Sequence, residues 1–179
     1  MFFIVSAVWA QSPNAPTVLI NEMTQTPIDY TTKKVVIFIH GWNPDGSPDS
    51  YAASPEWSNL ETQMKASLSG SDWGLILYHW EKDANTGLIS WGEPQTSQHA
   101  ADAAYNAFQN GTSIASLLLS AAPELREVHF IAHSAGTWAA YNAALTLLQN
   151  NPYVVVEITC STHLFPNLFL RYFTPHKVL

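Results

Sequence analysis

Four apolar runs are spaced along the chain, and each of the first three is followed by a longer helix-forming stretch. The runs are rich in Val, Ile, Leu and aromatic side chains and cover residues 34–40, 73–80, 127–132 and 153–159. Continuous apolar runs of this length are typical of strands that are buried on both faces of a sheet. The pattern therefore predicts four core strands.

The stretches between the runs carry helix signals. Residues 54–68 open with a Ser-Pro N-cap signal, and residues 137–149 follow the third run almost directly. Residues 96–122 are alanine-rich, with a weak point expected at Asn110 and Gly111. Strands that alternate with helices predict an α/β fold with a mostly parallel sheet, right-handed crossovers and flanking helices.

The remaining segments have the composition of loops. Residues 11–33 are rich in Pro, Thr and Asn, which predicts an arm with one short strand within residues 17–21. Residues 81–94 and 43–53 are also expected to be loops, and the second of these is placed to line a pocket or act as a lid. The length and the absence of a dividing linker predict a single domain over residues 11–179.

The first ten residues form an apolar run that is too short to span a bilayer. The run resembles the apolar part of a secretory signal, with Val8 and Ala10 as small residues before a cleavage point. A basic segment ahead of it is missing, so either the true start lies upstream or the run is a short strand. We predict a partial signal peptide and a secreted or periplasmic protein.

Charge and motif content exclude several classes of function. The net charge is −7 with only seven Lys and Arg residues, which disfavours nucleic acid and anionic membrane surfaces as partners. No later segment reads as transmembrane, and no glycine-rich phosphate loop follows a strand. Cys160 and His163 have a C-x-x-H spacing, but two ligands do not make a zinc site. We expect no nucleotide or other cofactor and no metal.

The third apolar run leads into Ala-His-Ser-Ala-Gly at residues 132–136, with a predicted helix directly after it. A serine on a sharp strand-to-helix turn is the nucleophile elbow G-x-S-x-G, and here Ala132 replaces the first glycine. Small residues are needed because strand and helix backbones nearly touch at such a turn. The alternative is a serine that only caps a helix. The flanking strand and helix favour Ser134 as a nucleophile.

A second polar motif, His40-Gly41-Trp42, follows the first run. The ends of parallel strands meet at one edge of the sheet, where open α/β sheets bind ligands. Ester hydrolysis needs two N–H groups that stabilise an oxyanion, and the backbone amides of Trp42 and Ala135 are the candidates. Taken alone, the motif would be a strand end followed by a turn. Its pairing with the serine turn favours the oxyanion hypothesis.

The sequences V-V-I-F-I-H-G-W and V-H-F-I-A-H-S-A-G resemble the lipase and esterase branch of the α/β-hydrolases, and pancreatic-lipase-like proteins most of all. The resemblance covers residues 34–159. It implies a carboxyl-ester hydrolase that acts on a small-molecule or lipid ester through an acyl-enzyme. It assigns Ser134 as the nucleophile and Trp42 and Ala135 as oxyanion donors, with site-shaping positions at His40, Gly41, His133 and Gly136.

The family pattern also requires an acid and a histidine after the nucleophile, and the chain departs from it there. No aspartate follows Ser134, and Glu157 lies inside a predicted strand. His163 and His176 lack the later strand that precedes the family's histidine. Acid and base stay unassigned, and the family fold would be incomplete at the C-terminus. An acyltransferase, a peptidase and a non-catalytic fragment or binding module remain alternatives.

The tail over residues 160–179 shows neither helix nor strand periodicity. A one-nucleotide shift in the codons for residues 160–166 permits Leu-Leu-Asp-Pro-Phe-Ile-Pro, which restores the family's Leu-Asp-Pro. The aspartate would stand at the position of Thr162. We therefore hypothesise that the tail is a frameshifted version of a longer lipase-like product.

The end of the second run offers further polar and aromatic side chains. His79 and Glu81 are interpreted as a solvated strand end rather than as groups that line the pocket. The aromatic residues Tyr78, Trp80 and Trp91 are expected in the core or the wall of a pocket rather than around a cofactor.

Overall fold

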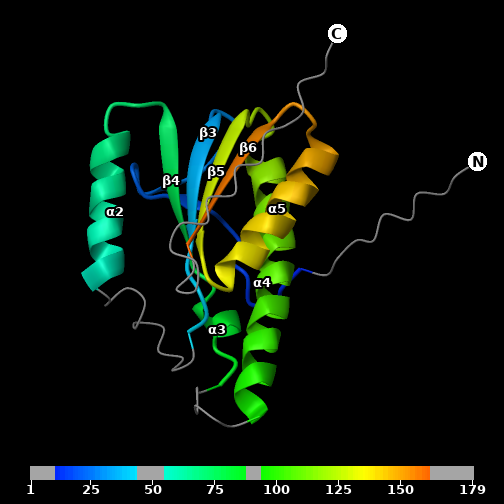
Figure 1. The fold of residues 1–179 in the computed structure, drawn as a ribbon. Helices are drawn as coiled ribbons and strands as arrows, with labels where there is room; N and C mark the ends of the chain where they lie inside the picture. Colours follow the sequence, from blue (N-terminus) through cyan, green and yellow to red (C-terminus); the bar gives the residue numbers. More distant parts are fainter. Residues whose placement is uncertain (1–10, 44–54, 88–93, 162–179) are drawn as a thin grey trace, which may run out of the picture.

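The structure, a computed structural model, describes residues 11–43, 55–87 and 94–161 (Figure 1). The side chains of residues 55–57 and 94–97 are outside this description. The predicted partial signal peptide, most of the loop expected over residues 43–53 and the tail beyond Ser161 also lie outside the described residues.

Among the described residues, the main sheet has four strands, all parallel, in the order β4-β3-β5-β6. The strands are β3 (Lys34–Ile39), β4 (Trp73–Tyr78), β5 (Glu127–His133) and β6 (Val155–Ser161). The prediction of a parallel sheet in an α/β fold is confirmed. The last strand begins two residues later than its apolar run and continues through Cys160, which the sequence assigned to the tail.

In the described part of the chain, four helices join and flank the strands: α2 (Pro55–Leu68), α3 (Glu81–Ala84), α4 (Pro94–Ala121) and α5 (Gly136–Asn150). The short helix α3 lies in a segment that was expected to be a loop. No helix in the described ranges is long and apolar enough to cross a membrane.

Helix α4 runs without interruption through Gly111, where the sequence predicted a weak point. A Cβ on Gly111 would lie 2.5 Å from the carbonyl oxygen of Ala139 in α5. The side chain of Asn142 in α5 also donates hydrogen bonds to Phe108 O at 2.7 Å and Thr112 Oγ1 at 2.9 Å. Gly111 therefore allows two helix backbones to pack closely, and this packing outweighs its low helix propensity.

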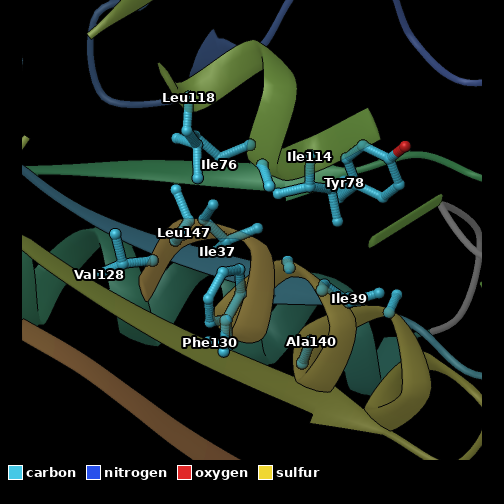
Figure 2. Close-up of a cluster of buried hydrophobic side chains, with 14 of the residues drawn as sticks. Ile37, Ile39, Ile76, Tyr78, Ile114, Leu118, Val128, Phe130, Ala140 and Leu147 are labelled. Carbon is cyan, nitrogen blue, oxygen red and sulfur yellow. The ribbon is translucent and has the colours of Figure 1, made fainter. Parts of the chain in front are cut away.

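Alternate side chains of each strand point to opposite faces of the sheet. One face, which carries Ile37, Ile39 and Phe130, packs against α4 and α5 and forms the core (Figure 2). Helix α2 lies on the other side of the sheet (Figure 1). Its side chains and those of Val36 and Ile131 line a groove there. The helices on both faces explain why the strands read as continuous apolar runs.

Two connections leave the sheet in opposite directions at its centre. The chain leaves β3 for α2 on one face, and it leaves the neighbouring strand β5 for α5 on the other (Figure 1). In open α/β sheets, ligands bind beyond the carboxyl ends of the two strands at which the direction reverses. Both polar motifs of the sequence lie at this point.

The arm before β3 contains a two-stranded hairpin, β1 (Ile20–Asn21) and β2 (Thr26–Pro27). The amide of Glu22 donates to Leu75 O at 2.7 Å, and Leu75 N donates to Asn21 Oδ1 at 3.2 Å. The short strand expected within residues 17–21 is thus reduced to its last two residues. The hairpin covers the outer edge of β4, which limits edge-to-edge association there.

Candidate functional site

Ser134 lies at the turn between β5 and α5, and its side chain is exposed. Its backbone φ is +50°, in the left-handed region that residues other than glycine rarely adopt. Within the described ranges only Gln25 shares this property among non-glycine residues. The sequence predicted a sharp turn here, and the structure holds the serine in the strained conformation that such a turn requires.

Gly136 begins α5 and lies against the end of β3. A Cβ at this position would come within 2.3 Å of His40 O and 2.8 Å of Ile39 O, both of them backbone atoms. The second glycine position of the elbow therefore has no room for a side chain. The first position tolerates Ala132, which is buried in the core at 1% exposure.

Gly41 brings the loop after β3 directly against the serine turn. A Cβ on Gly41 would lie 2.7 Å from His133 Nδ1 and 2.9 Å from Ser134 Cβ. The two motifs that the sequence placed at the same sheet edge are therefore in contact distance of each other. His133 is half-buried beside this contact and Ser134 remains open to solvent.

The amides of Trp42 and Ala135 make no hydrogen bond within the described residues. Ala135 precedes the first turn of α5, where backbone N–H groups have no partner inside the helix and the helix dipole favours negative charge. Gly41 O accepts a hydrogen bond from His40 Nδ1 at 2.8 Å. Because C=O and N–H are antiparallel in a trans peptide, the Trp42 N–H points away from the His40 ring.

The His40 side chain is buried, with 2% exposure, and its contacts hold the loop after β3 in place. A carbonyl can only accept, so the bond to Gly41 O fixes the proton on Nδ1. The ring stacks on Trp80 with centroids 5.3 Å apart, and Trp80 Nε1 donates to His40 O at 3.0 Å. Burial lowers the pKa of His40 to about 4, against the opposing charge of Glu81, so the ring is neutral near pH 7.

His79 and Glu81 form a close pair at the end of β4. His79 Nδ1 lies 2.6 Å from Glu81 Oε1, and this hydrogen bond raises the pKa of His79. Burial is the largest influence on Glu81 and raises its pKa, but the hydrogen bond from His79, a backbone hydrogen bond and the nearby histidines together outweigh it, so the pKa is lowered. Glu81 is mostly buried, at 12% side-chain exposure, so only His79 fits the predicted solvated strand end.

The His79–Glu81 pair is distant from Ser134 in the sheet. Strand β3 separates β4 from β5, which puts the two strands roughly 10 Å apart. The hydroxyl of Ser134 makes no hydrogen bond to any described residue. Glu157 lies inside β6, opposite His129, as the sequence predicted. Thr162, His163 and His176 are outside the described residues, so acid and base stay unassigned.

Two features of this edge were missed from the sequence. Trp80 is 2% exposed and binds the backbone of the loop after β3, a more specific role than a core or pocket wall. Helix α3 carries Asp83, which is 6% exposed and has hydrogen-bond donors around it. A buried aspartate gives no periodic signal, and its partners come from distant parts of the chain.

No group of three or more metal-binding side chains occurs within the described ranges. Comparison of the chain with protein-family models and with curated proteins gives no match. The site is therefore characterised by its own geometry: a strained, exposed serine at the start of a helix, packed against a glycine loop with a fixed peptide orientation.

Proposed function

We propose that the protein is a serine carboxyl-ester hydrolase of the α/β-hydrolase type, with Ser134 as the nucleophile. The positive φ of Ser134 at an exposed strand-to-helix turn is the observation that carries the proposal. Residues in the left-handed region cost of order 1–3 kcal/mol and cluster at active sites. In the proposed reaction, Ser134 Oγ attacks the ester carbonyl, the alcohol leaves, and water hydrolyses the acyl-enzyme.

The negative charge on the carbonyl oxygen would be stabilised by the amides of Trp42 and Ala135. Both N–H groups lack partners among the described residues, and both adjoin Ser134 through sequence or through Gly41. The start of α5 adds a favourable helix dipole. Loss of one such donor costs about 100- to 1,000-fold in rate in related chemistry.

The Ser134 hydroxyl makes no hydrogen bond to an acid or base among the described residues, so this chain is proposed to be a slow catalyst. The same observation favours a second candidate, a hydrolase-like module that binds an ester or acyl group without turning it over. An acyltransferase or a peptidase would use the same serine, since reaction choice depends on the pocket.

Covalent labelling with a fluorophosphonate probe tests the proposal. We expect slow labelling that is abolished in Ser134→Ala and retained in Ser120→Ala, whose serine is exposed at the far end of α4. Mass spectrometry of the labelled peptide locates the adduct. Labelling no greater than in Ser134→Ala would refute the nucleophile, and labelling at the rate of an intact triad enzyme would refute the slow catalyst.

Substrate class is tested separately, on a version extended in the other reading frame, if the gene encodes one. A panel of p-nitrophenyl esters and matching anilides distinguishes an esterase from a peptidase. We expect turnover of esters only. The nucleotide sequence after codon 159 decides the frameshift hypothesis, because the alternative frame must encode Asp-Pro and a later histidine.

A further inference from the structure

We propose that Asp83 is a positioning residue for the loop His40-Gly41-Trp42, and that docking of residues 12–14 on its carboxylate holds that loop in place. The inference rests on the proposed function for its catalytic consequence. The structural part of the inference concerns the contacts of α3 and does not depend on the proposed function.

Helix α3 contacts the loop on one side and is held through the Asp83 carboxylate on the other. On the loop side, Trp80, which precedes the helix, donates to His40 O at 3.0 Å, and the last helical residue, Ala84, accepts from Asn43 N at 3.2 Å. Glu81 Oε1 also approaches His40 Nε2 at 3.8 Å. These contacts flank Gly41 and Trp42 on both sides in sequence, so a shift of α3 must move the loop.

On its other side, α3 is held by its aspartate. The Asp83 carboxylate accepts hydrogen bonds from Ser12 Oγ, from Asn14 Nδ2 at 2.7 Å and from Asn110 Nδ2 at 2.6 Å. Asn106 Nδ2 additionally donates to Asp83 O at 2.9 Å. A buried carboxylate is costly unless donors surround it, so the helix is stable in this position only while these donors are present.

The donors come from two very different sources. Asn106 and Asn110 belong to the long helix α4, and the Tyr78 hydroxyl fixes Asn110 by donating to its Oδ1 at 2.7 Å. Burial raises the pKa of Tyr78, so this hydroxyl stays a neutral donor. Ser12 and Asn14 belong to the arm, which has no helix or strand of its own at that point. The arm is therefore the part of the support that can be lost first.

The consequence is a dependence of the site on the arm. With residues 12–14 docked, α3 and the loop are fixed, and the Trp42 amide keeps its direction. Without them, Asp83 is buried with two of its donors missing, and we expect α3 to move toward water together with the loop. Removal or displacement of the arm would thus lower the reactivity of Ser134 without any change at Ser134 itself.

Hydrogen exchange followed by mass spectrometry tests this coupling in the full chain. Ser12→Ala removes one donor, Ser12→Thr keeps the hydroxyl, and Thr17→Ala changes an exposed residue on the same arm. We expect exchange of the Asn43 amide, which donates to Ala84 O across the contact between the loop and α3, to rise about tenfold in Ser12→Ala, since a hydrogen bond to a charged group is lost. Ser12→Thr and Thr17→Ala should match the wild type, and Asp83→Asn should exceed Ser12→Ala where it folds.

Two results would overturn the inference. One is faster exchange of the arm in Ser12→Ala with an unchanged loop, which means that the arm detaches without consequence. The other is equal acceleration in the core of α5, which means a general loss of stability. The fluorophosphonate labelling rate, measured on the same variants, should fall about tenfold in Ser12→Ala and at least as much in Asp83→Asn, and it should match the wild type in Ser12→Thr and Thr17→Ala. Absence of labelling in the wild type would instead count against the proposed function, and the exchange data would keep their meaning.

Discussion

The turn after β5 and the loop after β3 end at the same edge of the sheet, but they keep their shapes in different ways. The turn is held by its own sequence neighbours and by the close contact of Gly136 with the backbone of β3. The loop is held by groups from other parts of the chain: the Trp80 side chain donates to His40 O, and the backbone carbonyl of Ala84 accepts from Asn43 N. The conformation of the turn is therefore expected to persist when other parts of the chain change, whereas the conformation of the loop depends on those parts.

The comparison extends to exposure. Ser134 is open to solvent and strained, while His40 is buried and surrounded by contacts. In the proposed reaction the nucleophile must reach its substrate, which agrees with an exposed turn that accepts backbone strain. The proposed oxyanion donor must not move, which agrees with a loop that is preorganised by burial and hydrogen bonds. The turn after β5 is therefore accessible to solvent, whereas the loop after β3 is rigid.

The largest expected effect comes from the contact of Gly136 with the backbone at the end of β3, which joins the turn after β5 to the loop after β3. Gly136→Ala would place a Cβ within 2.3 Å of His40 O, a backbone atom that cannot rotate away. We expect a loss of about 3 kcal/mol in the free energy of unfolding, measured by urea denaturation. Gln149→Ala, at an exposed position of the same helix, should stay within about 0.5 kcal/mol of the wild type. A loss of less than about 1 kcal/mol in the free energy of unfolding of Gly136→Ala would mean that the start of α5 is not in contact with the end of β3.

The pH dependence of stability tests the buried loop. The folded pKa of His40, about 4, lies below the usual 6.5, so between these values the unfolded chain binds a proton that the folded chain excludes. Stability therefore decreases as the pH falls from 6.5 to 4, by up to about 3 kcal/mol for this group. His40→Asn, whose amide can replace Nδ1 as the donor to Gly41 O, should remove this part of the decrease.

His79 gives the opposite sign and serves as the comparison for His40. Its pKa is raised by Glu81, so its contribution is present below pH 6.5 and is lost as the pH rises through the folded value. His79→Gln should therefore steepen the acid decrease that His40→Asn flattens. Urea denaturation between pH 4 and pH 8 measures both. Parallel pH profiles for the two variants would show that His40 is not buried as a neutral ring.

The smallest effect concerns the strain at the exposed turn. At φ +50°, glycine avoids the steric cost that a Cβ imposes, so Ser134→Gly should be more stable than Ser134→Ala by about 1 kcal/mol. Both variants lack the hydroxyl, so the difference reports on the backbone alone. Ala101→Gly, at an exposed position within α4, should show the reverse order by a similar amount. Equal stability of the two Ser134 variants would argue against a strained turn.

The sequence by itself determined the sheet and one half of the site. Period and composition predicted the four parallel strands and the large helices, since strands covered on both faces must be continuously apolar. The Ala-His-Ser-Ala-Gly motif predicted the sharp turn at Ser134, because conformation there is fixed by neighbours in the chain. The order of strands then placed His40-Gly41-Trp42 at the same edge.

Only the tertiary structure decided how the other half is supported. Helix α3 is four residues long, too short to show a period, and it was expected to be a loop. Asp83 gains its role from Ser12 and Asn110, which are 71 and 27 residues away along the chain. The sequence predicted a weak point at Gly111, whereas in the fold this glycine allows α5 to pack closely against α4. Contacts between residues far apart in sequence leave no local pattern, so the contacts of α3 and Asp83 that hold the loop are visible only in the folded chain.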